Sequence, residues 1–585
     1  MNKNIGKAID WTLLKRILKY VKPYKSTFWM TSFTTILLAV LSPIRPWLIQ
    51  YTFDNFIISA NNNMLLIMTL IMIGLLLFET IIQYHNTFST NWLGQTVVKD
   101  LRVDVFKHIL SFKLRYFDKT PIGTLVTRSI SDIETISDIF SQGLLVIIGD
   151  FLKILAVLAI MFYTDVKLTL ISLSTLPLLI FSAYLFKNAI KSAFQDVRTE
   201  VSKLNTFVQE HITGMNIVQI FNREAIEYEK FKVINQRHAD ANIRSVWHYS
   251  IFLPVVEILS AISIGVLIWW GGDKVMNENL TLGTIVAFIL YLNMLFRPIR
   301  EMADKFNTLQ MGMVSSERVF SLLDTKEEIL NDGTAKLKNV LGSIEFKNLW
   351  FSYNSDEWVL KDISFSINPG ETIAFVGATG AGKSSIVNVL GRLYEYNKGH
   401  ILIDGIELRE FEIPSVRENI SVVLQDVFLF SDTIANNISL NNPQISREQI
   451  IEASKIIGAH DFIMKLPGTY DFDVKERGGM LSVGQRQLIA FVRAYVYDPK
   501  ILILDEATSS VDTESEKMIQ YALDKITENR TSVIIAHRLS TIQKADQIIV
   551  LENGQIVESG SHQQLISKDG QYKKLFELQF QKVKP

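Results

Sequence analysis

The segment Gly377-Ala-Thr-Gly-Ala-Gly-Lys383-Ser384 matches the pattern G-x-x-x-x-G-K-[ST] of a phosphate-binding loop. It follows the apolar run 372–376, which predicts a buried strand, and precedes 386–390, which predicts a helix, as this motif requires. Glycines let backbone N–H groups surround phosphate oxygens, and the N-terminus of the helix adds a favourable dipole. The segment therefore predicts a nucleotide site, with Lys383 at the β- and γ-phosphates and Ser384 at Mg²⁺.

A second segment, 501–506, supplies the carboxylates that such a site needs. Its first four residues, Ile-Leu-Ile-Leu, predict a buried strand, and Asp505 and Glu506 follow directly. A carboxylate at the end of this strand lies near the Mg²⁺ of a phosphate-binding loop, and the next one accepts a proton from an attacking water. Together the two segments predict nucleotide hydrolysis.

The composition indicates that the first half of the chain lies in a membrane. Of 585 residues, 48% are hydrophobic and only 20% are charged, against about 25% in soluble domains. Residues 1–340 carry a net charge of +6 and residues 341–585 a net charge of −7, which together give −1. This asymmetry is typical of a membrane region joined to a soluble domain. No basic tail or patch indicates nucleic acid, and the absence of cysteine excludes disulfides, thiolate metal sites and a cysteine nucleophile.

Six apolar stretches approach the ~20 residues that a membrane-spanning helix needs. They cover approximately residues 26–50, 64–88, 143–163, 168–187, 251–271 and 281–299. Lys and Arg are concentrated before the first stretch and in the loop after the second. Because cytoplasmic loops carry the excess of positive charge, we expect a plasma (inner) membrane protein whose termini and long loops are cytoplasmic. The expected division is a transmembrane domain over 1–330, a linker over 331–342 and a nucleotide-binding domain over 343–585.

The two long inner loops, at about 91–140 and 190–248, are predicted to be helical. Apolar residues recur there at helical spacing, as in Leu101, Val105 and Ile109. We interpret them as membrane helices that continue into the cytoplasm. Separate helices on the membrane surface are the alternative.

Charged residues inside the predicted spans are candidates for function by default. We interpret Asp150 and Glu257 as residues that pair helices or lie at the interface rather than as cargo ligands. For Arg45, between two prolines, we favour snorkelling to the outer interface or pairing with a structural partner, and the alternative is that it lines a cavity and meets an anionic group. None of them identifies a cargo.

Further short motifs make the chain resemble the ATP-binding cassette (ABC) family. Leu481-Ser-Val-Gly-Gln485 is similar to the signature sequence that separates this family from other P-loop ATPases. The remaining motifs stand in the family's order and spacing: Tyr353 within Phe-Ser-Tyr-Asn, Gln425 within Leu-Gln-Asp, the loop 509–512 and His537 within Ala-His-Arg.

The resemblance implies a role for each of these residues. The residues expected to contact ATP are Tyr353, Gly377, Ala378, Thr379, Gly380, Ala381, Gly382, Lys383, Ser384, Ser385 and Gln425. The expected Mg²⁺ shell is Ser384, Gln425 and Asp505, and the expected catalytic residues are Glu506 as general base and His537 as stabiliser of the γ-phosphate. The residues expected to contact ATP bound to a partner cassette are Ser482, Gly484, Gln485 and Asp512.

The resemblance covers almost the whole chain and implies its architecture. We expect an all-α transmembrane domain of six helices, followed by a cytoplasmic α/β P-loop ATPase domain with an antiparallel β subdomain and a helical signature subdomain. This order is similar to that of half-transporter exporters of the lipid-flippase and multidrug type. Residues 117–125 and 214–222 resemble the segments that carry coupling helices in such exporters.

The expected activity is ATP-driven export or flipping of lipids or other amphipathic molecules by alternating access of a dimer. The expected partners are a second copy or a related half-transporter, membrane lipids and amphipathic or hydrophobic cargo. An obligate half of a heterodimer is the alternative, but an intact set with Glu506, His537 and Ser482 favours a homodimer. An ATP-gated channel or regulatory subunit would predict a regulatory insertion or a lost carboxylate, and neither is visible. No motif encodes the cargo.

Overall fold

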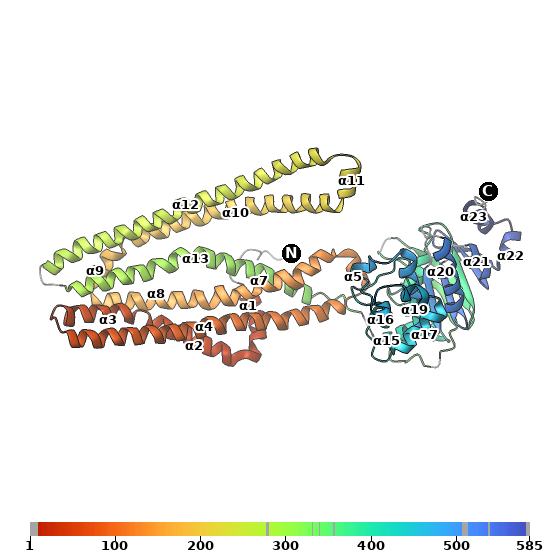
Figure 1. Cartoon of the computed structure of the whole chain (residues 1–585), viewed down its shortest axis with the longest axis horizontal. Helices are drawn as coiled ribbons and strands as arrows, with labels where there is room; N and C mark the ends of the chain where they lie inside the picture. Colours follow the sequence, from red (N-terminus) through yellow and green to blue (C-terminus); the bar gives the residue numbers. More distant parts are fainter. Residues whose placement is uncertain are drawn as a thin grey trace. The chain divides into compact units, whose positions relative to one another are not determined.

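The computed structural model describes residues 10–276, 280–329, 331–338, 340–354, 357–505, 513–535 and 539–580. The chain forms two compact units (Figure 1). Unit 1 contains the described residues up to Leu110 and the range Ile122–Lys326, whereas unit 2 contains Ser111–Pro121 and the described residues from Glu327 onward. A short segment between two helices of the first half thus packs with the second half.

The described residues of unit 1 form helices and the short connections between them, without a strand. Its α-helices are α1 (Trp11–Val21), α2 (Lys25–Leu41), α3 (Ile44–Thr52), α4 (Asn62–Leu110), α6 (Ile122–Thr127), α7 (Ile133–Asp138), α8 (Leu144–Thr164), α9 (Val166–Ser172), α10 (Leu176–Thr213), α11 (Met215–Ile220), α12 (Glu224–Met276) and α13 (Leu282–Leu323). Six helical stretches in the described part of the chain are long and apolar enough to cross a membrane: Trp11–Ile57, Asn62–Leu110, Ile122–Thr164, Val166–Thr213, Glu224–Met276 and Leu282–Glu301.

The long helices extend well beyond the thickness of a bilayer. α4 has 49 residues, about 74 Å at 1.5 Å per residue, whereas a hydrocarbon core is about 30 Å thick. α10 and α12 lie side by side and are joined at their tips by α11 (Figure 1). The long helices α4, α10 and α12 therefore carry the apolar stretches on into the inner segments, which are interrupted only by short connections such as 111–113 and 221–223. This continuity contradicts the interpretation as separate surface helices.

Ion pairs connect the helices of unit 1. Lys305 of α13 lies 2.6 Å from the carboxylate of Asp150 on α8. Arg300 of α13 pairs with Glu257 of α12. Pairing lowers the free-energy cost of holding a charge inside an apolar domain. The pairing interpretation of Asp150 and Glu257 is confirmed, and the role of Arg45 stays a prediction.

Large apolar side chains remain exposed along the helices of unit 1. Examples are Trp29, Phe33, Ile36, Leu70, Leu77, Ile81, Phe181 and Leu185. Soluble proteins rarely expose apolar surface to this extent, because its contact with water is unfavourable. The exposed apolar surface therefore indicates contact with lipid.

Unit 2 contains two β-sheets. The antiparallel sheet has the order β2-β1-β4-β5, formed by β1 (Ile344–Phe351), β2 (Leu360–Ile367), β4 (Lys398–Ile403) and β5 (Ile406–Glu407). The larger sheet has the order β10-β9-β3-β8-β7-β6, formed by β3 (Thr372–Val376), β6 (Ile420–Val423), β7 (Ile501–Asp505), β8 (Thr531–Ile535), β9 (Gln547–Glu552) and β10 (Gln555–Gly560). All its neighbouring strands are parallel except β9 and β10.

Ten α-helices follow the strands of unit 2 in its described residues, besides α5 (Leu114–Lys119) of the inserted segment. They are α14 (Lys383–Leu390), α15 (Ile413–Asn419), α16 (Ile434–Ser439), α17 (Arg447–Ile457), α18 (His460–Met464), α19 (Val483–Val496), α20 (Thr513–Thr527), α21 (Leu539–Lys544), α22 (His562–Ser567) and α23 (Gln571–Phe580).

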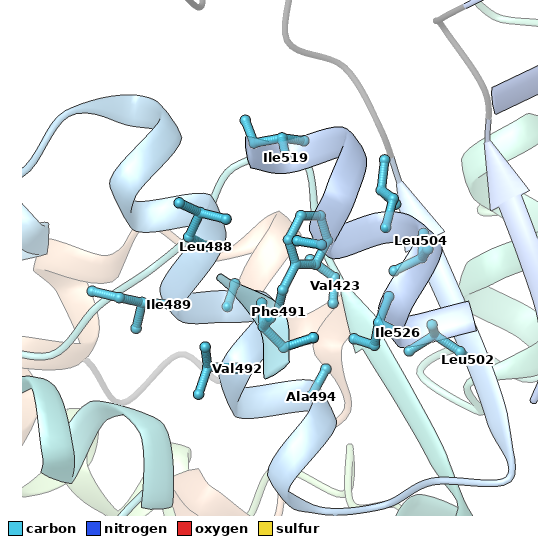
Figure 2. Packing of buried hydrophobic residues seen from close by; sticks show 14 of the residues in the cluster. Val423, Leu488, Ile489, Phe491, Val492, Ala494, Leu502, Leu504, Ile519 and Ile526 are labelled. Carbon is cyan, nitrogen blue, oxygen red and sulfur yellow. The ribbon is translucent and has the colours of Figure 1, made fainter. Parts of the chain in front are cut away.

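The larger sheet separates two hydrophobic cores because its side chains alternate between faces. Ile501 and Ile503 of β7 point into a core shared with α14 and the antiparallel sheet. Leu502 and Leu504 point into the opposite core, where α19 and α20 pack and Phe491 lies at the centre (Figure 2). The antiparallel and helical subdomains expected from the resemblance are both present.

Candidate functional site

The glycine loop joins β3 to α14, as its sequence predicts. Its backbone leaves no room for side chains at two positions. A Cβ atom on Gly377 would lie 2.3 Å from the carbonyl oxygen of Leu551. Gly382, at the start of α14, has φ of +101°, which other residues rarely adopt. The loop therefore presents its backbone directly to a ligand.

Lys383 folds over the loop that precedes it. Its Nζ donates hydrogen bonds to the carbonyl oxygens of Gly377 at 2.8 Å and Ala378 at 3.0 Å. Burial lowers the pKa of Lys383 from its usual value, and the Asp505 carboxylate opposes that decrease. These contacts place a lysine ammonium group at the loop.

The other residues of the loop divide into exposed and buried groups. Ala378, Thr379, Gly380 and Ser384 are exposed, whereas Ala381, Gly382, Lys383 and Ser385 are buried. The exposed residues form the rim of the loop. Of the buried residues, Ala381 belongs to the hydrophobic core that α14 shares with the antiparallel sheet.

Ser384 and Asp505 bring together two oxygen atoms that can serve as metal ligands beside the loop. Asp505 ends β7, and the Ser384 Oγ lies 3.4 Å from its Oδ2. A hydroxyl and a carboxylate are oxygen donors of the kind that Mg²⁺ takes in phosphate sites, together with phosphate oxygens and water. Among the described residues no cluster of three or more His, Asp or Glu could hold a metal. The donor set fits Mg²⁺ bound together with a phosphorylated ligand.

Gln425 emerges from the same edge of the sheet as Asp505. It follows β6, whose Val423 pairs in parallel with Leu504 of β7. The side chain of Gln425 is exposed. The topology therefore brings Gln425 to the carboxyl ends of the strands, where α/β sheets bind ligands.

Tyr353, just beyond β1, lies against the loop helix. Its hydroxyl is 3.2 Å from the Ser385 Oγ and accepts a hydrogen bond from the Asn388 Nδ2 at 2.8 Å. Its ring and the ring of Tyr394 are nearly perpendicular, with ring centroids 5.0 Å apart. The sequence did not indicate that Asn388 and Tyr394 lie beside Tyr353, because no spacing rule links them, and the structure shows both in contact with Tyr353.

The signature segment begins α19. The Ser482 Oγ accepts a hydrogen bond from the Gln485 backbone N–H at 3.2 Å, and the Gln485 side chain accepts one from the Ser482 N–H at 2.9 Å. This reciprocal pair is a capping box, which fixes where the helix starts. Ser482 is exposed and Gly484 is buried. The exposed helix start is suited to an anion.

Three predicted residues, Glu506, Asp512 and His537, lie outside the described residues. The strands that precede them are β7 and β8, which pair in parallel, and β8 also pairs in parallel with β3. The carboxyl ends of these strands share one edge of the sheet with the glycine loop.

Two family models match the chain. One is described as the ABC transporter transmembrane region and matches residues 28–299, and the other is described as ABC transporter and matches residues 360–509. Over 579 residues the chain is 39% identical to the uncharacterized ABC transporter ATP-binding protein YknV of Bacillus subtilis, covering 98% of this chain and 96% of that protein.

Two further relatives have more specific names. The chain is 37% identical over 576 residues to the putative multidrug export ATP-binding/permease protein YgaD of Bacillus subtilis, covering 97% of this chain and 99% of that protein. It is 35% identical over 573 residues to the ATP-dependent lipid A-core flippase of Syntrophus aciditrophicus, covering 98% of this chain and 95% of that protein.

A membrane region and an ATPase domain thus occur on one chain, with six helical stretches able to cross a membrane and a loop shaped for phosphate. One ATPase domain for each membrane region is the architecture of a half-transporter, which works as a dimer. The chain belongs to the ABC transporter family, as a multi-pass membrane protein that couples ATP hydrolysis to transport.

Proposed function

We propose that ATP binds with its phosphates in the Gly377–Gly382 loop and its adenine on Tyr353. The contact of Ser384 with Asp505 beside the loop carries this proposal. Lys383 supplies positive charge at the β- and γ-phosphates. Glu506, the residue after Asp505, acts as general base on the attacking water, and His537 stabilises the γ-phosphate.

Ser384, Gln425 and Asp505 form the proposed Mg²⁺ shell. When bound, Mg²⁺ neutralises charge on the β- and γ-phosphate oxygens. The chain itself holds the oxygen donors in place, because Ser384 belongs to the first turn of α14 and Asp505 ends the buried strand β7.

Ser482, Gly484, Gln485 and Asp512 are proposed to contact ATP bound to a second cassette. The exposed start of α19 supports this role, because the dipole of the helix favours the charge of a γ-phosphate at its N-terminus. ATP between two cassettes stabilises their closed pair, and hydrolysis lets the pair open. We propose a homodimer, supported by the intact motif set on this chain, with a heterodimer as the alternative.

The proposed transport reaction is export or flipping of lipids or amphipathic small molecules. Two relatives named above are a putative multidrug exporter and a lipid A-core flippase, which supports this cargo class.

We place the protein in the plasma (inner) membrane with both termini cytoplasmic, because Lys and Arg are concentrated in the predicted inner segments. We also propose that residues 331–342 are the linker between the transmembrane domain and the nucleotide-binding domain.

The test is ATP turnover of the chain purified alone in lipid nanodiscs, with a panel of lipids and amphipathic drugs. E506Q is the blank, because loss of the general base should retain ATP binding and lower turnover by orders of magnitude. Cooperative turnover stimulated by an amphipathic compound is the expected result. Wild-type turnover no higher than that of E506Q would contradict a self-sufficient homodimer, and near-normal turnover of E506Q would contradict the assignment of Glu506.

A further inference from the structure

The segment that resembles a coupling helix is part of unit 2. It contains α5 and is attached to the chain that leads into the ATPase domain. The Lys113 N–H donates to the Glu327 carbonyl at 2.8 Å, and the Ile329 N–H donates to the Ser111 carbonyl at 3.0 Å. Both ends of the segment continue into helices of unit 1. A movement of α5 is therefore passed covalently to α4 and α6.

Three aromatic rings form a cluster beside the nucleotide site. Tyr353 lies 4.7 Å from Phe351 and 5.0 Å from Tyr394, and Phe351 lies 6.1 Å from Tyr394, measured between ring centroids. Each pair meets at 70° or more, which is the favoured edge-to-face arrangement. Phe351 is buried. Because each ring contacts the other two, displacement of one disturbs its neighbours.

The helix that follows the glycine loop holds two members of this cluster. Asn388, in the last turn of α14, donates its side-chain amide to the Tyr353 hydroxyl. The same residue accepts a hydrogen bond at its carbonyl oxygen from the Tyr394 N–H, at 3.2 Å. Tyr394 is thus connected to the phosphate-binding helix through its backbone and to Tyr353 through its ring.

The hydroxyl of Tyr394 contacts α5. It donates a hydrogen bond to the carboxylate of Asp118. Burial and the hydrogen bond to the Asp118 carboxylate raise the pKa of Tyr394 well above its usual value. The contact joins residues 276 positions apart in the sequence.

We propose that Tyr394 is a positioning residue that transmits nucleotide occupancy from Tyr353 and α14 to Asp118 of α5. The proposal rests on the proposed function, in which adenine stacks on Tyr353. A nucleotide that restricts the positions of Tyr353 and α14 also restricts the position of Tyr394. Through the hydrogen bond to Asp118, it then restricts the segment between α4 and α6. A nucleotide changes the position of this cluster only if it binds one arrangement of the rings more tightly than another.

The test measures hydrogen–deuterium exchange of the peptide covering 112–121 in the full chain in nanodiscs. Exchange is compared with and without saturating MANT-ATP and Mg²⁺, a fluorescent nucleotide whose affinity is measured in the same preparations. In the wild type, nucleotide is expected to slow exchange in this peptide. Y394F removes the hydroxyl and keeps the ring, and D118N removes the charge of the acceptor. Y394F is expected to lose the nucleotide-dependent difference. D118N is expected to reduce it, because the amide oxygen still accepts the hydrogen bond but no longer carries a charge. Both variants are expected to retain MANT-ATP affinity.

Y396F is the matched control. Tyr396 is a buried tyrosine two positions away whose hydroxyl donates to Glu407 of the antiparallel sheet instead of α5. Y396F should keep the full nucleotide-dependent difference, and the double variant Y394F/D118N should lose no more than Y394F alone. If Y394F and D118N keep the wild-type difference, or if the wild type shows none, the proposal is overturned. Failure of the wild type to bind MANT-ATP would instead overturn the proposed function on which it rests.

Discussion

Gly382 adopts the left-handed backbone conformation at the start of α14. Replacing it with alanine should weaken ATP binding only by changing the shape of the glycine loop. Gly382 has φ of +101° and contributes no side chain to the site. An added Cβ would lie 2.8 Å from the Leu360 Cδ2 and 3.2 Å from the Val359 carbonyl oxygen. G382A therefore introduces backbone strain and crowding next to Lys383 without removing any polar group.

The size of the effect follows from these two contributions. A residue with a side chain in a left-handed conformation costs roughly 1–2 kcal/mol, and overpacking costs about 1–3 kcal/mol. The Leu360 methyl is the end of a flexible side chain and can move, so we expect a total near the lower end, about 2–3 kcal/mol. If the free loop relaxes and must be restored for binding, the affinity falls about 30- to 150-fold, at 1.4 kcal/mol per factor of ten.

The assay is a MANT-ATP titration of the full chain in nanodiscs, together with its thermal unfolding midpoint. G405A is the matched control. Gly405, in the turn between β4 and β5, has φ of +79°, and an added Cβ would meet no atom within 4 Å. G405A should lose stability through strain and bind nucleotide like the wild type. Wild-type affinity in G382A would refute the reasoning, as would an equal loss of affinity in G405A.

Two further variants test the core and the metal site. F491A leaves a cavity in the core between α19 and the sheet, so it should lower the free energy of unfolding by about 3–5 kcal/mol and lower the thermal unfolding midpoint of the ATPase domain. F428A, at a side chain that is 53% exposed, should leave the midpoint nearly unchanged. Equal midpoints in the two variants would contradict a buried structural role for Phe491. S384A should raise the Mg²⁺ concentration for half-maximal ATP hydrolysis and leave MANT-ATP binding in EDTA unaffected, measured by phosphate release and fluorescence. An unchanged Mg²⁺ requirement would remove Ser384 from the proposed shell.

Local features of the sequence predict much of the ATPase domain. The apolar run 372–376 is β3 at those same limits, and the glycine loop leads into α14 as expected. These predictions succeed because a strand, a tight loop and a helix start are set by neighbouring residues through hydrophobic pattern and backbone freedom. The six apolar stretches are equally local, since a bilayer demands long apolar helices. The roles of Glu506, Asp512 and His537 stay predictions.

Only the tertiary structure decided which distant residues meet. Lys305 of α13 pairs with Asp150 of α8, and Tyr394 donates a hydrogen bond to Asp118, 276 positions earlier in the chain. Residues 117–125 resemble a coupling segment, but only the structure shows that the whole range 111–121, between two helices of unit 1, packs with unit 2. Such contacts depend on how whole elements pack, and packing is fixed by the shapes of many side chains together rather than by any periodicity along one segment.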